Sequence, residues 1–339
     1  MKWILSIFVL LTGFSLLAQT DYWAYQIYFS DCAINHIPKG ITIPDNDRKS
    51  REIINSIISG SSYDQLLNKF PDSLNLKLEK LISGKVIEQN QNGFRLLFPV
   101  FVDKKRLELQ KIVHNRLVES KFSIDTIIYT LNHKLSKNPE MIFHFLWSRI
   151  IDDCWWNLFN ETFNTDKGPP SIAFIVYPPH PFQCGTNSDY SPNNDMFAMS
   201  WSYNIFNESF KVPSTELFFN LAKTGIVPEN DQDFFVQHGL IDSKNHSTLF
   251  TYHENDSIDQ MCDSLKNIYI NKVKGLFNYS ELRNIFQIPA EEIFIIISHE
   301  IAYEIIQEIN NKNKLFITIT KADNSNLNFK YLVSIRYQK

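Results

Sequence analysis

The chain has little glycine and little cysteine for its length, with 10 glycines and 4 cysteines among 339 residues. It contains no glycine-rich phosphate loop, no G-x-S-x-G elbow and no C-x-x-C pair, and therefore carries none of the usual signatures of nucleotide binding, serine hydrolysis or zinc binding. The content of 44% hydrophobic and 14% aromatic residues is ample for packed cores. With modest charge and few glycines, it excludes a disordered or low-complexity chain.

Long apolar runs are also missing, except at the N-terminus. Met1-Lys2-Trp3 is a short charged start, residues 4–17 are almost wholly apolar, and Ala18 offers a small residue at a cleavage position. This pattern is typical of a secretory signal peptide, so we expect residues 1–18 to be removed and residues 19–46 to form an N-terminal extension. The alternative, an uncleaved anchor, needs about 20 apolar residues. The expected location is secreted or periplasmic, with no transmembrane segment after cleavage.

The four cysteines are Cys32, Cys154, Cys184 and Cys262. An exported context permits disulfides, and four cysteines allow three complete pairings. Cys154 lies in an apolar, helix-like stretch where a buried free thiol is an equally good interpretation. The sequence does not determine the pairing.

Charge is distributed unevenly along the chain, whose formal net charge is −4. Residues 48–121 carry 14 Lys and Arg against 8 Asp and Glu, whereas residues 122–339 carry 17 against 25. The basic first part and the acidic remainder indicate either an anionic partner or two surfaces that attract each other.

Two short matches indicate an internal repeat. Gly84-Lys85-Val86-Ile87 matches Gly239-Leu240-Ile241-Asp242, and Glu140-Met141-Ile142-Phe143 matches Glu291-Glu292-Ile293-Phe294. The matches are 155 and 151 residues apart, so both order and spacing are nearly kept. We expect a mostly helical α+β protein built by internal duplication, with a first repeat at 47–207 and a second at 213–339. Each repeat would hold a winged-helix-like module followed by helices and a β-hairpin.

The first module supplies the detailed pattern. Apolar spacing predicts three helices between Asp47 and Gly84, and strands follow on either side of the Asn92-Gly93 turn. Over residues 47–102 this order resembles the winged helix-turn-helix family. The resemblance implies that the third helix and the hairpin contact nucleic acid, through Asn75, Lys77, Lys80 and Arg95. Export favours a structural or protein-binding use of the module instead, and nucleic acid is not an expected partner.

The remaining elements follow in the same order in both repeats. In the first, we expect helices within 103–163 and a hairpin at 171–206, whose strands flank a Pro/Asn/Gly loop at 178–194. In the second, we expect a winged-helix-like module at 213–253, helices within 257–310 and a hairpin at 314–337.

Each long apolar helix carries two charged residues one turn apart, Arg149 with Asp153 and Glu300 with Glu304. Buried charges need partners. One interpretation is a structural network in which the two helices pack together and Arg149 pairs with Glu300 or Glu304. The other is a polar cleft in which His299, the two glutamates and Asp153 bind a metal or act as acid and base.

Metal-binding signals are weak. His299-Glu300 begins an H-E-x-x-H pattern, but Tyr303 occupies the position of the second histidine. His180 and Cys184 share a proline-rich loop. His246 and His253 lie near Glu254, Asp256 and Asp259, a group that could hold a cation or form a solvated hairpin. We expect no cofactor.

The function best supported by the sequence is an exported, non-catalytic binding or assembly protein of the bacterial cell envelope, whose partner is a protein or another envelope component. The alternative is a hydrolase, possibly metal-dependent, with a His/carboxylate cleft between the two long helices. Neither substrate nor oligomeric state can be inferred from the residues.

Overall fold

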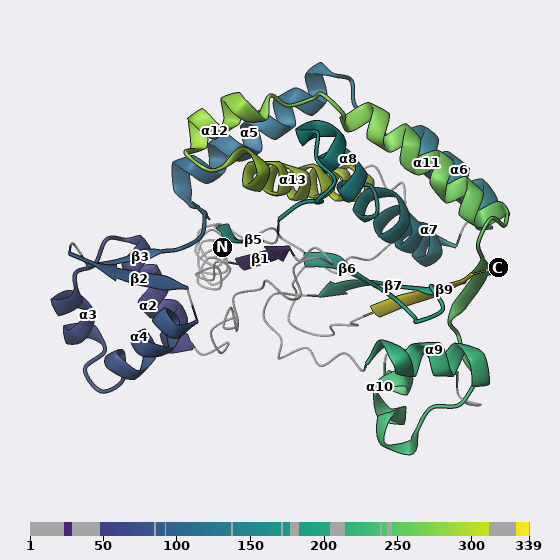
Figure 1. The fold of residues 1–339 in the computed structure, drawn as a ribbon, viewed down its shortest axis with the longest axis horizontal. Coiled ribbons are helices and arrows are strands. Elements are labelled where there is room, and N and C mark those ends of the chain that lie inside the picture. The colour runs from purple at the N-terminus through teal and green to yellow at the C-terminus, as the bar shows by residue number, and fades with distance from the viewer. Residues whose placement is uncertain are drawn as a thin grey trace, which may run out of the picture. The chain divides into compact units, whose positions relative to one another are not determined.

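A computed structural model describes residues 24–28, 48–84, 86–91, 93–136, 138–170, 172–176, 183–203, 214–237, 239–242, 246–311 and 330–338. The chain forms two compact units, one of residues 1–112 with 170–180 and the other of residues 113–169 with 181–339 (Figure 1). The fold is α+β and mostly helical, as expected. The expected signal peptide lies outside the described residues. No helix in the described part of the chain has the length and apolar character needed to cross a membrane.

The first unit contains three consecutive helices followed by a hairpin. They are α2 (Arg48–Ile58), α3 (Tyr63–Lys69), α4 (Leu74–Ser83), β2 (Ile87–Asn90) and β3 (Gly93–Leu96). Ser62 forms a capping box with Gln65 at the start of α3, and Gly93 adopts the φ of +127° that the turn requires. Ile53, Leu66 and Leu78 meet in one core cluster. The predicted order of elements is therefore present, while kinship with winged helices stays a prediction.

The same unit contains a small sheet that the sequence did not predict. Its order is β1 (Ala24–Tyr28), β5 (Ile172–Val176) and β4 (Val100–Phe101), with β5 antiparallel to β1 and parallel to β4. The hairpin expected at 171–206 is therefore wrong in its first strand, because both hydrogen-bonding edges of β5 are occupied by β1 and β4, and residues 183–190 pair with the expected second strand instead. Residues 183–190, which were expected to belong to the loop at 178–194, form a strand.

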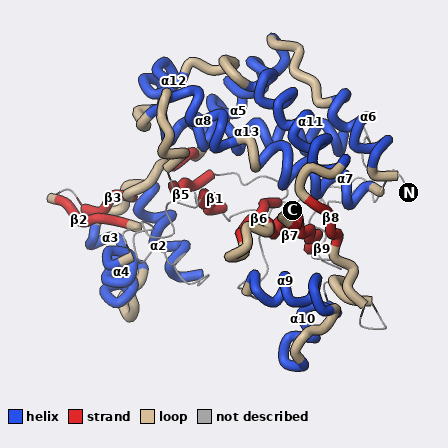
Figure 2. The backbone as a smooth tube through the Cα atoms, turned by 45° about the vertical axis from the view of Figure 1, so that its right-hand side comes forward, coloured by secondary structure: helices blue, strands red, loops and turns tan. Residues whose placement is uncertain are grey.

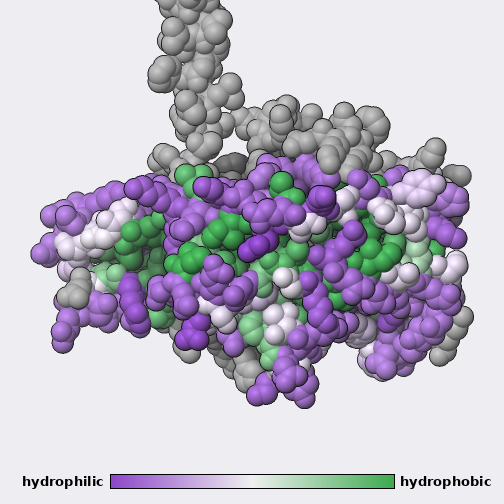
Figure 3. Space-filling view, turned by 90° about the horizontal axis from the view of Figure 1, so that it is seen from above, coloured by the Kyte–Doolittle hydropathy of each residue, from purple (hydrophilic) through white to green (hydrophobic). Residues whose placement is uncertain are grey.

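The second unit contains two runs of helices in the same order. The first run is α5 (Asp103–Glu119), which begins in the first unit, α6 (Asp125–Lys134), α7 (Pro139–Phe145), the π-helix η2 (Leu146–Asp152) and α8 (Trp155–Phe163). The second run is α11 (Ser257–Val273), α12 (Tyr279–Phe286) and α13 (Ala290–Asn311). Equivalent helices begin 154, 154 and 151 residues apart. The first long helix differs from expectation because η2 interrupts it. On this helical layer, apolar residues form a band flanked by hydrophilic ones (Figure 3).

The four-stranded sheet of the second unit has the order β6 (Gln183–Tyr190), β7 (Met196–Tyr203), β9 (Lys330–Tyr337) and β8 (Phe250–His253). β9 is antiparallel to β7 and parallel to β8. The expected hairpin at 314–337 is wrong in its pairing, because both edges of β9 are already occupied. The strand expected at 315–320 lies outside the described residues. In the expected second wing, Ile241 and Ser247 form only an isolated bridge.

Helices cover this sheet on both faces (Figure 2). Phe197 and Met199 of β7 join Val333 of β9 in a core cluster with α9 (Thr215–Thr224) and α10 (Gln232–Gln237). Side chains alternate along a strand, so Ser200 and Ser334 point to the opposite face, where they contact α7. One face of the sheet thus packs on an apolar cluster, and the other combines two serines with aromatic side chains such as Phe250 and Tyr252, which contact Phe145 of α7.

Two cysteines are free thiols. Cys154 and Cys262 are both buried and unpaired, which excludes all three complete pairings and confirms the buried-thiol interpretation of Cys154. Cys32 lies outside the described residues, and Cys184 lies in β6.

A pair of glycine substitutions tests the packing of the second unit. Gly168 and Gly225 have φ of +67° and +71°, but only at Gly168 would an added Cβ meet the Trp156 ring, at 2.3 Å. Both changes to alanine carry the backbone cost of about 1 kcal/mol, and Gly168→Ala should cost roughly 1–3 kcal/mol more through overpacking. Urea unfolding of both variants measures the difference. Equal losses would show that the Trp156 contact is not tight in solution.

Candidate functional site

Arg149 lies at the centre of the charged residues in the second unit. It belongs to η2, and its side chain is only 2% exposed. A π-helix, in which hydrogen bonds span five residues, is rare and is frequently found at functional sites. Here the π-helix carries a permanently charged guanidinium into the interior.

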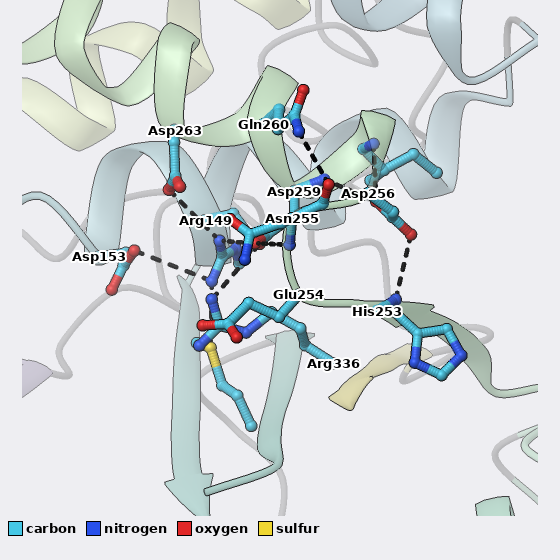
Figure 4. Close-up of polar contacts among 12 residues, drawn as sticks. Arg149, Asp153, His253, Glu254, Asn255, Asp256, Asp259, Gln260, Asp263 and Arg336 are labelled. Atoms are coloured by element: carbon cyan, nitrogen blue, oxygen red, sulfur yellow. Dashed lines mark hydrogen bonds and ion pairs between the residues drawn. The ribbon is translucent and has the colours of Figure 1, made fainter. Parts of the chain in front are cut away.

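The guanidinium lies near two carboxylates of α11 and one at the end of η2 (Figure 4). Its Nη2 donates to Asp259 Oδ1 at 2.8 Å and lies 3.6 Å from Asp263 Oδ1, both on α11. Its Nη1 lies 4.0 Å from Asp153 Oδ2 and donates to Met196 Sδ at 3.1 Å. The pair with Asp259 is the most deeply buried contact, since that carboxylate is 3% exposed.

Two further cations complete the cluster. Lys266 donates to Asp153 at 2.9 Å and lies 3.3 Å from Asp263, and Arg336 of β9 lies 3.4 Å from Asp259. Three cations therefore balance three carboxylates. Exposure rises from the Arg149–Asp259 pair toward Asp263, whose side chain is 51% exposed. The six residues are called the Arg149 network below.

The carboxylates keep Arg149 charged despite its burial. Burial lowers the pKa of Arg149, but the nearby charges, including those of Asp153 and Asp259, raise it, and the net direction is upward. The pKa of Lys266 is also raised, because Asp153 and Asp263 outweigh the effect of burial. Arg149 and Lys266 therefore both stay protonated at neutral pH and act as fixed positive charges in the network.

The predicted partners of Arg149 are wrong, although the expected ion-pair network is present. Its carboxylates come from Asp153, which caps the end of η2, and from α11, in place of Glu300 or Glu304 on α13. Glu304 instead lies 3.1 Å from His114 Nδ1 on α5, and Glu300 is buried. Asp259 and Lys266 are seven residues apart on α11, a spacing that places them on one helix face.

The residues of the proposed His/carboxylate cleft make several separate contacts, since Asp153 belongs to the Arg149 network and Glu304 lies beside His114. His299 Nδ1 lies 2.8 Å from the carbonyl oxygen of Ile295, and its ring stacks on Trp155. His246 lies 3.3 Å from Asp242, whereas the His253 ring lies tilted against the ring of Tyr337. Over the described ranges, no three His, Cys, Asp or Glu side chains are grouped so that they could hold a metal ion.

The polar group expected around the second wing serves mainly to start a helix. Asp256 is the N-cap of α11 and accepts hydrogen bonds from the backbone of Ile258 and Asp259. These hydrogen bonds lower its pKa, against the opposing effect of burial. Asp259 accepts from the backbone of Asn255 while it pairs with Arg149. His180 lies outside the described residues.

His144 is a buried polar residue that the sequence analysis missed. It lies on α7, five residues before Arg149, and is fully buried. Its Nδ1 lies 3.0 Å from Ser200 Oγ on β7, and its Nε2 lies 2.7 Å from Ser334 Oγ on β9. The imidazole therefore links one helix to two neighbouring strands. The available signal in the sequence was the presence of a small polar residue, Ser200 or Ser334, in each of the two strands, which could have indicated a buried polar partner.

Burial holds the pKa of His144 down at about 3, with a further contribution from the charge of Arg149. The imidazole is thus neutral, so one ring nitrogen donates its hydrogen to one serine hydroxyl and the other ring nitrogen accepts from the second serine hydroxyl. This arrangement joins secondary structures and contains no carboxylate to orient a catalytic histidine.

Comparison with models of protein families, with curated proteins and with solved structures gave no match. The interpretation of the site therefore rests on its own geometry.

His144 predicts a specific acid sensitivity. Its pKa is 6.5 when unfolded and about 3 when folded, so the unfolded chain binds the extra proton between these values. Stability should be complete above pH 6.5 and fall as the pH drops toward 3, by up to about 1.4 kcal/mol per pH unit. His144→Gln should flatten this dependence, as measured by urea unfolding across the range, and should lower stability at pH 7.

The exposed His133 on α6 provides the control. His133→Gln should keep the acid dependence of the parent protein. An unchanged slope in His144→Gln would mean that this imidazole is not held neutral.

Proposed function

We propose that the protein is an exported, non-catalytic binding or assembly protein of the bacterial cell envelope. The observation that carries the proposal is the balance of charge in the Arg149 network. Its buried cation is met by protein carboxylates, with no net charge left for a substrate group to neutralise. Such a network stabilises the packing of η2 on α11. The N-terminal pattern of residues 1–18 supplies the export part of the proposal.

We also infer that the body arose by internal duplication. The helices α5, α6 and α7–α8 recur as α11, α12 and α13 with nearly constant spacing. The third helix of the first set contacts the first helix of the second through Arg149 and Asp259. Reciprocally, α13 contacts α5 through Glu304 and His114. Reciprocal contacts of this kind are what a two-fold relation between similar halves requires.

In this proposal the winged-helix-like module of residues 47–102 serves as a protein-binding element. Helix α4 and the segment directly after β3 expose large apolar side chains, with Leu76 at 59% and Leu97 at 44% exposure. Exposed apolar anchors of this size are typical of protein contacts. Export removes the nucleic acid that a related DNA-binding module would contact.

Substitution of Arg149 tests the fastening role. Arg149→Met leaves Asp259 buried with only Arg336 nearby, and should cost about 3–5 kcal/mol in urea unfolding. Arg149→Met combined with Asp259→Leu should cost less than Arg149→Met alone, because no unmatched buried carboxylate remains. The exposed Arg283 on α12 is the matched control, and Arg283→Met should change stability by less than about 0.5 kcal/mol. Near-parental stability of Arg149→Met would contradict the proposal and favour a catalytic Arg149.

Export is tested separately with the full chain expressed in a bacterium. The mature protein should begin at Gln19 and appear in the periplasmic fraction or the medium, as read by mass spectrometry. Leu10→Arg interrupts the apolar run and should leave the full-length chain in the cytosol. Full-length parental chain in the cytosol would refute the export assignment.

A further inference from the structure

We draw no further inference here: the strongest candidate, the outer face of α9 and α10, where Ile226 and Val236 are exposed together with the acidic Glu229 and Asp233, is a surface patch for which nothing in the described part of the chain shows what covers it.

Discussion

The buried pair between Arg149 and Asp259 is the constraint on which the second unit depends. It joins residues 110 positions apart, and it fixes η2 against α11 at a depth where an unmatched charge would cost several kcal/mol. Because the guanidinium must reach a carboxylate on another helix, the position and rotation of η2 are set by that contact. The π-helix is compatible with this requirement, since it changes the direction in which successive side chains point.

Polar contacts as well as apolar packing hold the helical layer against the sheet. His144 contacts serines on β7 and β9, and Arg336 of β9 reaches the same Asp259 that pairs with Arg149. Hydrogen bonds have directional requirements that apolar contacts lack, so they specify one register of helix on sheet. The apolar face of the sheet, packed on α9 and α10, contributes burial but less directional information.

Local patterns in the sequence predicted most helices, and contacts between distant residues explain what was missed. Apolar spacing located α2 to α4, α11 and α12, and the capping residue Ser62 was visible directly. Strand pairing was mispredicted because β5 and β9 each pair with strands distant in the chain, which no local pattern encodes. β6 contains Gly, Asn, Ser and Asp, so its strand conformation comes from pairing with β7 and not from propensity. The partners of Arg149 were missed for the same reason, although its need for a carboxylate was predicted.

If the two halves are duplicates, their charges have diverged in a way that limits how they can pack. The first long helix carries Arg149 toward the acidic face of α11, whereas α13 carries Glu304 toward α5, a helix rich in lysine and arginine. An exchange of the two long helices would place Arg149 beside the basic α5 and Glu304 beside Asp259 and Asp263. Both contacts would be repulsive in a partly buried setting, where screening is weak. Opposite charge on the equivalent helices therefore distinguishes two halves that similar apolar faces alone would leave interchangeable.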